Sequence, residues 1–298
     1  MARLLKPFEY FEPGTVAEAR KLLSAYGDEA KVFAGGTDLL ISMKKRQMTP
    51  KYIICIKNIP DLDYIQYSQE AGLLKIGALA THSAIAASPI IRNKFELLAT
   101  ASHKVGTPQV RNMGTIGGNI CEAGPSQDTT PALLALDAKL KVIGLNSERI
   151  VPISQFFIAP FQTALGKTEL LTEIQIPALP PKSAGCYKWF TKTVTVDETL
   201  VGVAVTMSLN SIDGICSDIK IGLCSVAPTP IRARRAEEVL QGKKIDSGLI
   251  EEAAQAAADE TRPRSRPDYR RSMTRVLVAE AINEAWQKIE QAHLREAA

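Results

Sequence analysis

Short apolar runs separated by polar and glycine-containing turns predict an N-terminal unit of strands and helices. Residues 8–11, 31–34 and 52–56 are apolar runs of strand length. Between the first two runs, Thr15 and Glu18 have the spacing of a helix capping box, and Gly27 suits the residue that ends this helix. A helical turn is expected over residues 39–43. Together these elements predict a first subdomain of about residues 1–58, built as a strand–loop–helix–strand unit.

The same kind of alternation predicts a second subdomain over about residues 59–177. Strands are expected at 73–79, 139–143 and 170–176, where apolar residues dominate. Helices are expected at 82–87, which Thr81 would cap, and at 89–102 and 131–136. These two parts together form one predicted domain, residues 1–177.

A proline-rich linker at residues 177–181 separates this domain from a C-terminal region with a different pattern. Three strand-like segments come first, at 187–192, 201–209 and 219–226, and helical segments follow at 233–240, 248–258 and 269–292. Because the strands precede the helices, residues 182–298 are predicted to form a small α+β domain with a three-stranded antiparallel sheet.

The composition is that of an ordinary globular protein. The chain has 298 residues, of which 45% are hydrophobic and 23% are charged, enough to build more than one core. The net charge is +4, and aromatic residues do not alternate with the basic residues as they do in proteins that bind single-stranded nucleic acid. Nucleic acid is therefore not an expected partner. No apolar run reaches the length of a membrane span and the N-terminus lacks a leader-like apolar region, so we expect a cytoplasmic protein.

The cysteines and histidines give no sign of a disulfide framework or a metal centre. There are five cysteines, and no two of them have C-x-x-C spacing. The three histidines form no cluster with them, so no bound metal is expected. Cys121 is interpreted as a structural thiol, and neither His82 nor His103 is assigned a role.

Two glycine-rich segments carry most of the chemical information. The first glycine segment is residues 34–38, Ala-Gly-Gly-Thr-Asp, and the second is residues 114–119, Gly-Thr-Ile-Gly-Gly-Asn. Each is expected to be a loop beside a strand that offers consecutive backbone N–H groups, an arrangement that binds phosphate oxygens. Two such segments far apart in sequence predict a ligand with two phosphates, such as a dinucleotide cofactor. Neither has the glycine spacing of a Rossmann fingerprint or the lysine of a Walker loop.

These segments and several others resemble the FAD-binding medium subunit of the molybdenum hydroxylases, a family that includes xanthine dehydrogenase and carbon monoxide dehydrogenase. The similar stretches occur in the family's order along nearly the whole chain, at residues 34–40, 76–82, 110–120, 125–138, 227–233 and 268–271. The resemblance implies a vanillyl-alcohol-oxidase (PCMH)-type FAD-binding domain of two α/β subdomains, followed by the family's smaller C-terminal α+β domain.

The resemblance also implies non-covalently bound FAD and a set of residues that hold it. No catalytic acid, base or nucleophile is expected in this chain. The residues assigned to FAD are Val32, Phe33, Ala34, Gly35, Gly36, Thr37, Asp38, Leu39, Thr115, Ile116, Gly117, Gly118, Asn119, Asp128, Leu171 and Lys188.

Structural alternatives remain for several of these residues. Gly35 and Gly36 suit a plain strand-to-helix turn, and residues 115–119 suit a bulge or tight corner. Asp128 suits the N-cap of the helix that follows it, and Asp38 is expected to cap the helix after the first glycine segment. Lys188 suits either a place near the isoalloxazine or an exposed strand position. Leu171 is expected to serve mainly in core packing.

In the family's arrangement, this chain would accept electrons at FAD from the [2Fe–2S] clusters of a small partner subunit and deliver them to an external acceptor such as NAD. A large partner subunit would carry molybdopterin, in a dimer of heterotrimers. Residues 192–197 depart from the family's usual basic, arginine-containing pattern, so the resemblance does not carry over the family's flavin potential or a nicotinamide contact at this stretch. The arginines of residues 262–271 suit solvated surface or a subunit-docking face. The alternatives are a stand-alone FAD-dependent oxidase or reductase and a non-redox nucleotide-binding scaffold.

Overall fold

The N-terminal part of the chain contains a small parallel sheet with one helix packed on it and a second, shorter helix after the strand Ala30–Phe33. The structure is a computed structural model that describes residues 4–193, 198–210 and 215–297. The sheet has the order β1-β3-β2, with β1 at Glu9–Phe11, β2 at Ala30–Phe33 and β3 at Tyr52–Cys55. The helices are α1 at Val16–Tyr26 and α2 at Leu39–Lys44, and a 3₁₀ turn lies at Gly27–Glu29.

The predicted ends of the first helix are confirmed. The Thr15 hydroxyl accepts a hydrogen bond from the Glu18 amide at 3.2 Å, and the Glu18 carboxylate accepts one from the Gly14 amide at 2.8 Å. Gly27 follows the helix with a φ of 52°, a conformation that glycine adopts without strain. Local chemistry therefore fixes where this helix begins and ends.

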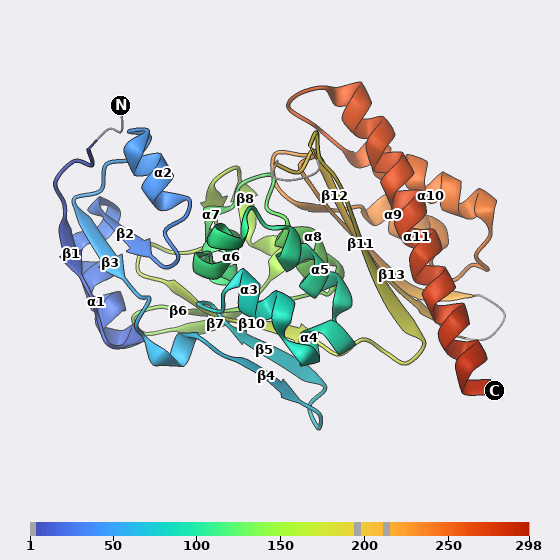
Figure 1. The fold of residues 1–298 in the computed structure, drawn as a ribbon, viewed down its shortest axis with the longest axis horizontal. Helices are drawn as coiled ribbons and strands as arrows, with labels where there is room; N and C mark the ends of the chain where they lie inside the picture. Colours follow the sequence, from blue (N-terminus) through green and yellow to red (C-terminus); the bar gives the residue numbers. More distant parts are fainter. Residues whose placement is uncertain (1–3, 194–197, 211–214, 298) are drawn as a thin grey trace.

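The middle of the chain forms a five-stranded antiparallel sheet with helices on one side (Figure 1). The strand order is β4-β5-β10-β6-β7. The strands are β4 Ile65–Ser68, β5 Leu73–Gly77, β6 Lys139–Ile143, β7 Glu148–Pro152 and β10 Leu170–Pro177, and a separate hairpin joins β8 Phe157–Ala159 to β9 Gln162–Thr163. The helices are α3 His82–Ala87, α4 Pro89–Lys94, α5 Glu96–Lys104, α6 Pro108–Met113, α7 Ile116–Glu122 and α8 Thr129–Ala135, with 3₁₀ turns at Pro60–Leu62 and Ile153–Gln155.

Two features of this part differ from the sequence prediction. The helix expected over residues 89–102 is broken at Phe95, which has φ −139° and ψ 46° and buries its ring in the core. The strands β4 and β7 were not predicted because each is a short edge strand with few apolar residues. They form because they pair by backbone hydrogen bonds with the predicted strands, β4 with β5 and β7 with β6.

The C-terminal part is a four-stranded antiparallel sheet of order β11-β12-β13-β14, followed by three helices. The strands are β11 Ser183–Phe190, β12 Val201–Leu209, β13 Cys216–Cys224 and β14 Ile231–Arg232; the helices are α9 Arg234–Leu240, α10 Ser247–Glu260 and α11 Pro267–Ala297. The prediction of three strands was therefore one too few. The fourth strand has only two residues, too few to produce an alternating pattern.

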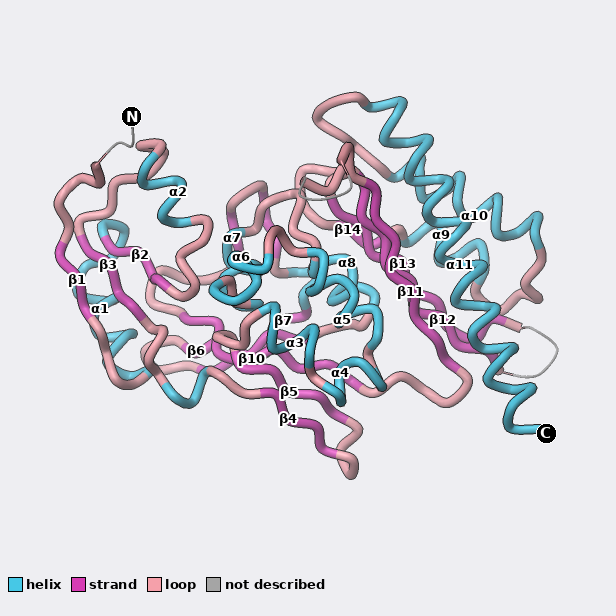
Figure 2. The backbone as a smooth tube through the Cα atoms, viewed as in Figure 1, coloured by secondary structure: helices cyan, strands magenta, loops and turns pink. Residues whose placement is uncertain are grey.

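This sheet is covered on both faces by helices from different parts of the chain (Figures 1 and 2). Helices α9, α10 and α11 pack on one face, and α8 and α5 of the preceding part pack on the other. The approach of α8 is so close that a Cβ atom built on Gly222 of β13 would lie 2.9 Å from the Pro131 carbonyl carbon. Every residue of β12 is buried, as expected for a central strand with both faces covered.

Part of the predicted basic stretch is structural rather than free surface. The Arg270 guanidinium donates to the carbonyl oxygens of Leu200 and Ser225 at 2.6 and 2.5 Å. Arg262 donates to the carbonyl oxygens of Asp259 and Thr261 at 3.0 and 2.8 Å. Their acceptors lie at or next to the ends of α10, β12 and β13. Within the described residues, none of the helices combines the length and apolar character needed to cross a lipid bilayer.

Candidate functional site

The two glycine segments meet in space although almost eighty residues separate them in sequence. A Cβ atom built on Gly35 would lie 2.8 Å from the Gly114 Cα atom and 2.9 Å from the Met113 carbonyl carbon. A Cβ atom on Gly114 would lie 3.5 Å from the Thr37 hydroxyl. Only a residue without a side chain fits at Gly35, so its glycine is required by the crossing of two backbones.

The first glycine segment presents a run of free backbone donors. Among the described residues, the N–H groups of the five residues Gly35 to Leu39 have no hydrogen-bond acceptor. Gly36 has a φ of 72°, and the Phe33 ring packs over its Cα atom. Part of this run consists of the N–H groups that precede and begin α2, and such groups are met by water or by a ligand. This run is therefore suited to a ligand rich in acceptor oxygens.

The second glycine segment is not a loop of free donors, and this part of the prediction was wrong. It follows helix α6 rather than a strand, and Thr115 is the N-cap of α7. The amides of Ile116 and Gly117 donate to the carbonyl oxygens of Ala80 and Ala78, at 3.0 and 2.9 Å.

The next two amides of this segment are also used within the protein. Gly118 donates to the Thr115 hydroxyl at 3.1 Å, and Asn119 donates to the Thr115 carbonyl oxygen at 2.9 Å. The Thr115 amide itself has no acceptor among the described residues. This single group is the backbone donor that the second segment retains for a ligand.

Close packing explains one of the glycines in the second segment. A Cβ atom on Gly117 would lie 2.6 Å from the Ala78 carbonyl oxygen and 2.7 Å from the Ala78 Cβ atom. The Ala78 amide in turn donates to the Thr172 carbonyl oxygen at 3.0 Å. Gly117 therefore lets α7 approach the end of β5 and the start of β10, where Leu171 lies buried in the core.

Two carboxyl groups lie near these segments. Asp38 does not cap α2 with its side chain, so that prediction was wrong. Desolvation raises the pKa of the Asp38 carboxyl, although a hydrogen bond from Thr37 opposes the shift. Burial, together with the Asp38 charge, raises the pKa of Glu122 to about 7. At neutral pH the Glu122 carboxyl is therefore partly protonated, which lowers the negative charge beside the first glycine segment.

A chain of polar contacts leads from the second glycine segment to the C-terminal part of the chain. The Asn119 side chain accepts a hydrogen bond from the Thr129 hydroxyl at 2.6 Å and donates to Gln127. The adjacent Asp128 accepts a hydrogen bond from the Thr199 hydroxyl at 2.6 Å. Its side chain makes no N-cap bond to α8, so the capping alternative does not hold.

The Asp128 carboxyl is an acceptor in a partly buried place between the two parts of the chain. Burial raises its pKa to about 6, and the hydrogen bond from Thr199 partly opposes this shift. The sequence analysis did not predict a role for Thr199, because no motif in the residues around it indicates a binding site. Residues 194–197, just before it, lie outside the described residues.

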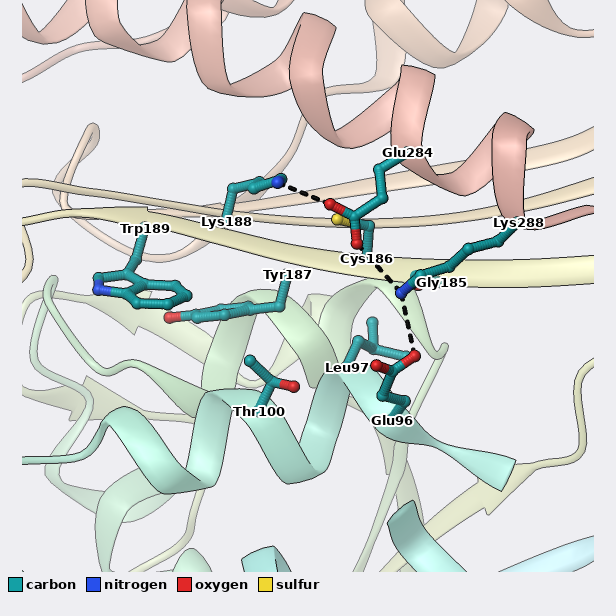
Figure 3. A pocket seen from close by; sticks show the side chains of 10 residues that line it. All are labelled: Glu96, Leu97, Thr100, Gly185, Cys186, Tyr187, Lys188, Trp189, Glu284 and Lys288. Atoms are coloured by element: carbon teal, nitrogen blue, oxygen red, sulfur yellow. Dashed lines mark hydrogen bonds and ion pairs between the residues drawn. The ribbon is translucent and has the colours of Figure 1, made fainter. Parts of the chain in front are cut away.

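Lys188 points away from the face of β11 that packs on α5 (Figure 3). Its amino group forms an ion pair with Glu284 of α11 at 2.6 Å, and its side chain is 30% exposed. Tyr187 and Trp189 lie on the opposite face, with their rings stacked at a centroid distance of 6.1 Å. The flavin role predicted for Lys188 would require this ion pair to open.

A cavity of about 250 Å³ lies beside this ion pair, between α5, β11 and α11 (Figure 3). Its charged lining is already paired: the Lys288 amino group contacts both Glu96, at 3.0 Å, and Glu284, at 3.1 Å. The Tyr187 hydroxyl is buried and has no partner among the described residues.

Comparison with known proteins agrees with this arrangement. The family model described as the FAD binding domain in molybdopterin dehydrogenase matches residues 6–179, and that of the CO dehydrogenase flavoprotein C-terminal domain matches residues 186–285. The carbon monoxide dehydrogenase medium chain of Hydrogenophaga pseudoflava is 36% identical over 94% of this chain and 97% of its own length. The chain belongs to the FAD-binding medium-subunit family of the molybdenum hydroxylases.

Other members of the medium-subunit family match over the same length. The glyceraldehyde dehydrogenase medium chain of Sulfolobus acidocaldarius is 33% identical over 93% of this chain and 98% of its own length. A solved structure of carbon monoxide dehydrogenase from Hydrogenophaga pseudoflava superimposes with a TM-score of 0.91 at 36% identity, covering 95% of this chain and 99% of that one. The predicted fold class is therefore confirmed for both parts of this medium subunit.

The residues of this medium subunit fit the FAD of its family. The first glycine segment offers the free donors that a diphosphate requires, and Asp128 offers an acceptor at the far end of a connected series of polar residues. Hydrophobic residues of the predicted set, among them Val32, Ile116 and Leu171, belong to or pack on the cores beside these groups.

Proposed function

We propose that this chain binds FAD non-covalently and works as the electron-transfer subunit of a molybdenum hydroxylase. The observation that carries the proposal is the run of five free backbone donors at Gly35 to Leu39, placed where two glycine segments cross. A diphosphate presents only acceptor oxygens, so it complements a run of free backbone donors.

Each residue of the proposed site has a defined task. The amides of Gly35 to Leu39 and of Thr115 bind the diphosphate. Asp128, oriented by Thr199, accepts a hydrogen bond from the cofactor's polar groups. Phe33 and Gly36 hold the shape of the first segment, and Leu171 supports the floor of the site. FAD supplies the redox chemistry when bound, and the chain supplies its position and surroundings.

The rest of the complex is proposed from the relatives. They are named as medium chains or FAD-binding subunits of dehydrogenases, which implies that other chains accompany them. We propose a large partner that carries molybdopterin and a small partner that carries [2Fe–2S] clusters, in a dimer of heterotrimers in the cytoplasm. Electrons would pass from the clusters to FAD and then to an external acceptor such as NAD.

Titration of the purified chain with FAD tests the first part of the proposal. We expect saturable, reversible binding at one site, seen as a change in flavin fluorescence, and release of unmodified FAD on denaturation. The Gly14→Ala variant should bind FAD with the affinity of the wild type, because a Cβ atom at this position, away from the site, meets only the Glu18 carboxylate, at 3.7 Å. A chain that binds no FAD in this assay contradicts the proposal.

Purification of the complex tests the second part. Co-purification with iron, molybdenum and two further polypeptides is expected, together with reduction of the bound flavin by the substrate of the large subunit. A chain that binds FAD and turns over a substrate by itself is instead a stand-alone oxidase or reductase. A chain that binds FAD but whose flavin is not reduced in the complex is a scaffold.

A further inference from the structure

His82 lies where the two glycine segments cross. It is the first residue of α3, and its amide donates to the Gly114 carbonyl oxygen at 3.1 Å. A Cβ atom built on Gly114 would lie 3.3 Å from the His82 Cδ2 atom and 3.5 Å from the Thr37 hydroxyl. The imidazole therefore shares one side of Gly114 with Thr37, the third residue of the run of free donors.

The ring is buried without the partners that a buried histidine normally has. His82 is 2% exposed, and its Nδ1 atom has no hydrogen-bond partner among the described residues. Burial, and to a smaller extent the nearby Arg111 charge, lower its pKa to about 4, so the ring is neutral at physiological pH. Arg111 is itself held by the carbonyl oxygens of Val105 and Gly106, at 3.1 and 3.0 Å.

The two ring nitrogens differ in their surroundings. Nδ1 lies in the protein interior, whereas Nε2 is bonded to Cδ2, the atom that faces Gly114. A neutral imidazole has one N–H donor and one acceptor nitrogen. Since Nδ1 has no acceptor to receive a proton, the tautomer with the proton on Nε2 places its donor on the side of the glycine segments.

We propose that His82 is a side-chain ligand of the FAD diphosphate, donating its Nε2 proton to a phosphate oxygen beside the amides of the first glycine segment. The inference rests on the proposed function, because it takes FAD as the ligand. The neighbouring groups support a phosphate rather than a sugar or a base edge, because the amides of Gly35 to Leu39 can all donate. A neutral donor also adds a hydrogen bond without a buried charge.

The test compares His82→Leu, which removes the donor, with His82→Gln, whose amide can replace Nε2–H. We expect His82→Leu to weaken FAD and ADP binding by about tenfold to a hundredfold, the range for a hydrogen bond to a charged group. His82→Gln should stay within about threefold of the wild type. Binding of riboflavin, which has no phosphate, should be the same in all three proteins.

The thermal unfolding of the apoprotein separates a ligand from a structural residue. His82→Leu should unfold at the same temperature as the wild type or above it, because it removes an unpartnered buried nitrogen. His103→Leu, at an exposed position of α5, is the matched control and should change neither property.

Three results would overturn the inference. The first is that His82→Leu binds FAD as tightly as the wild type does. The second is that His82→Leu loses riboflavin affinity by the same factor as FAD affinity. The third is that the apoprotein of His82→Leu is less stable than the wild type and that His82→Gln does not restore this stability. If His82→Leu does not fold, His82→Asn takes its place, since its shorter side chain cannot reach the Nε2 position. If the wild type binds no FAD, the proposed function fails instead.

Discussion

Substitution of Gly35 by alanine tests whether the crossing of the two glycine segments creates the cofactor site. The added Cβ atom would lie within 2.9 Å of three backbone atoms of Met113 and Gly114, and backbone cannot rotate away as a side chain can. One segment must therefore retreat from the other. Overpacking of this kind costs about 1–3 kcal/mol of folding free energy.

The effect on FAD should exceed the effect on stability. Displacing the first segment moves its free amides out of register with Thr115 on the other side of the crossing. Each hydrogen bond to a charged group contributes about 1.5–3 kcal/mol, so misplacing two of them predicts a loss of FAD affinity of about a hundredfold or more. The melting temperature of the apoprotein should fall by only about 2–10 °C.

Fluorescence titration with FAD and thermal unfolding of the apoprotein measure the two effects on the same preparations. Gly14→Ala, where the added atom has open space, should match the wild type in both assays. The reasoning is refuted if Gly35→Ala binds FAD with wild-type affinity. It is also refuted if the free energy of FAD binding that the variant loses is no larger than the free energy of unfolding that it loses.

Three further predictions follow from the same geometry. Gly117→Ala should destabilise the protein by about 1–3 kcal/mol, because its Cβ atom meets the backbone of Ala78, whereas Gly14→Ala should stay within about 1 kcal/mol of the wild type; equal effects in chemical denaturation would contradict this. The pKa of Glu122 is raised in the folded state to about 7 from a usual value of 4.5, so its contribution to stability is present at low pH and is lost as the pH rises through 7. Glu122→Gln should therefore raise the melting temperature at pH 8 and have almost no effect at pH 4, and a gain that is independent of pH would argue against this assignment. Lys188→Met should lower stability by about 1 kcal/mol or less by breaking its partly exposed ion pair, with no change in the flavin reduction potential; a shifted potential would show that the amino group reaches the flavin.

Features set by neighbouring residues could be read from the sequence. The capping box of Thr15 and Glu18 and the end of the helix at Gly27 depend on contacts within a few residues. The strands β3, β5, β6 and β10 are buried enough to leave a clear apolar pattern. Local chemistry and strong burial are the signals that a single sequence carries.

Features set by distant residues were missed. β14 and the edge strands β4 and β7 form because a predicted neighbouring strand supplies their hydrogen bonds. Phe95 breaks a helix because its ring is buried elsewhere in the core. Thr199 and His82 became candidates only when the fold placed them beside Asp128 and Gly114.

The two glycine segments show why similar sequences need not have similar tasks. Both were interpreted as phosphate-binding loops, because glycine permits free amides and tight turns alike. In the first segment the amides are free, while in the second they are used and the glycine at 117 serves the packing of α7 against Ala78. Backbone donors for the diphosphate therefore come mainly from one side of the crossing. A ligand held from both sides then needs side-chain donors on the other side, and His82, packed on Gly114, is in the position to provide one.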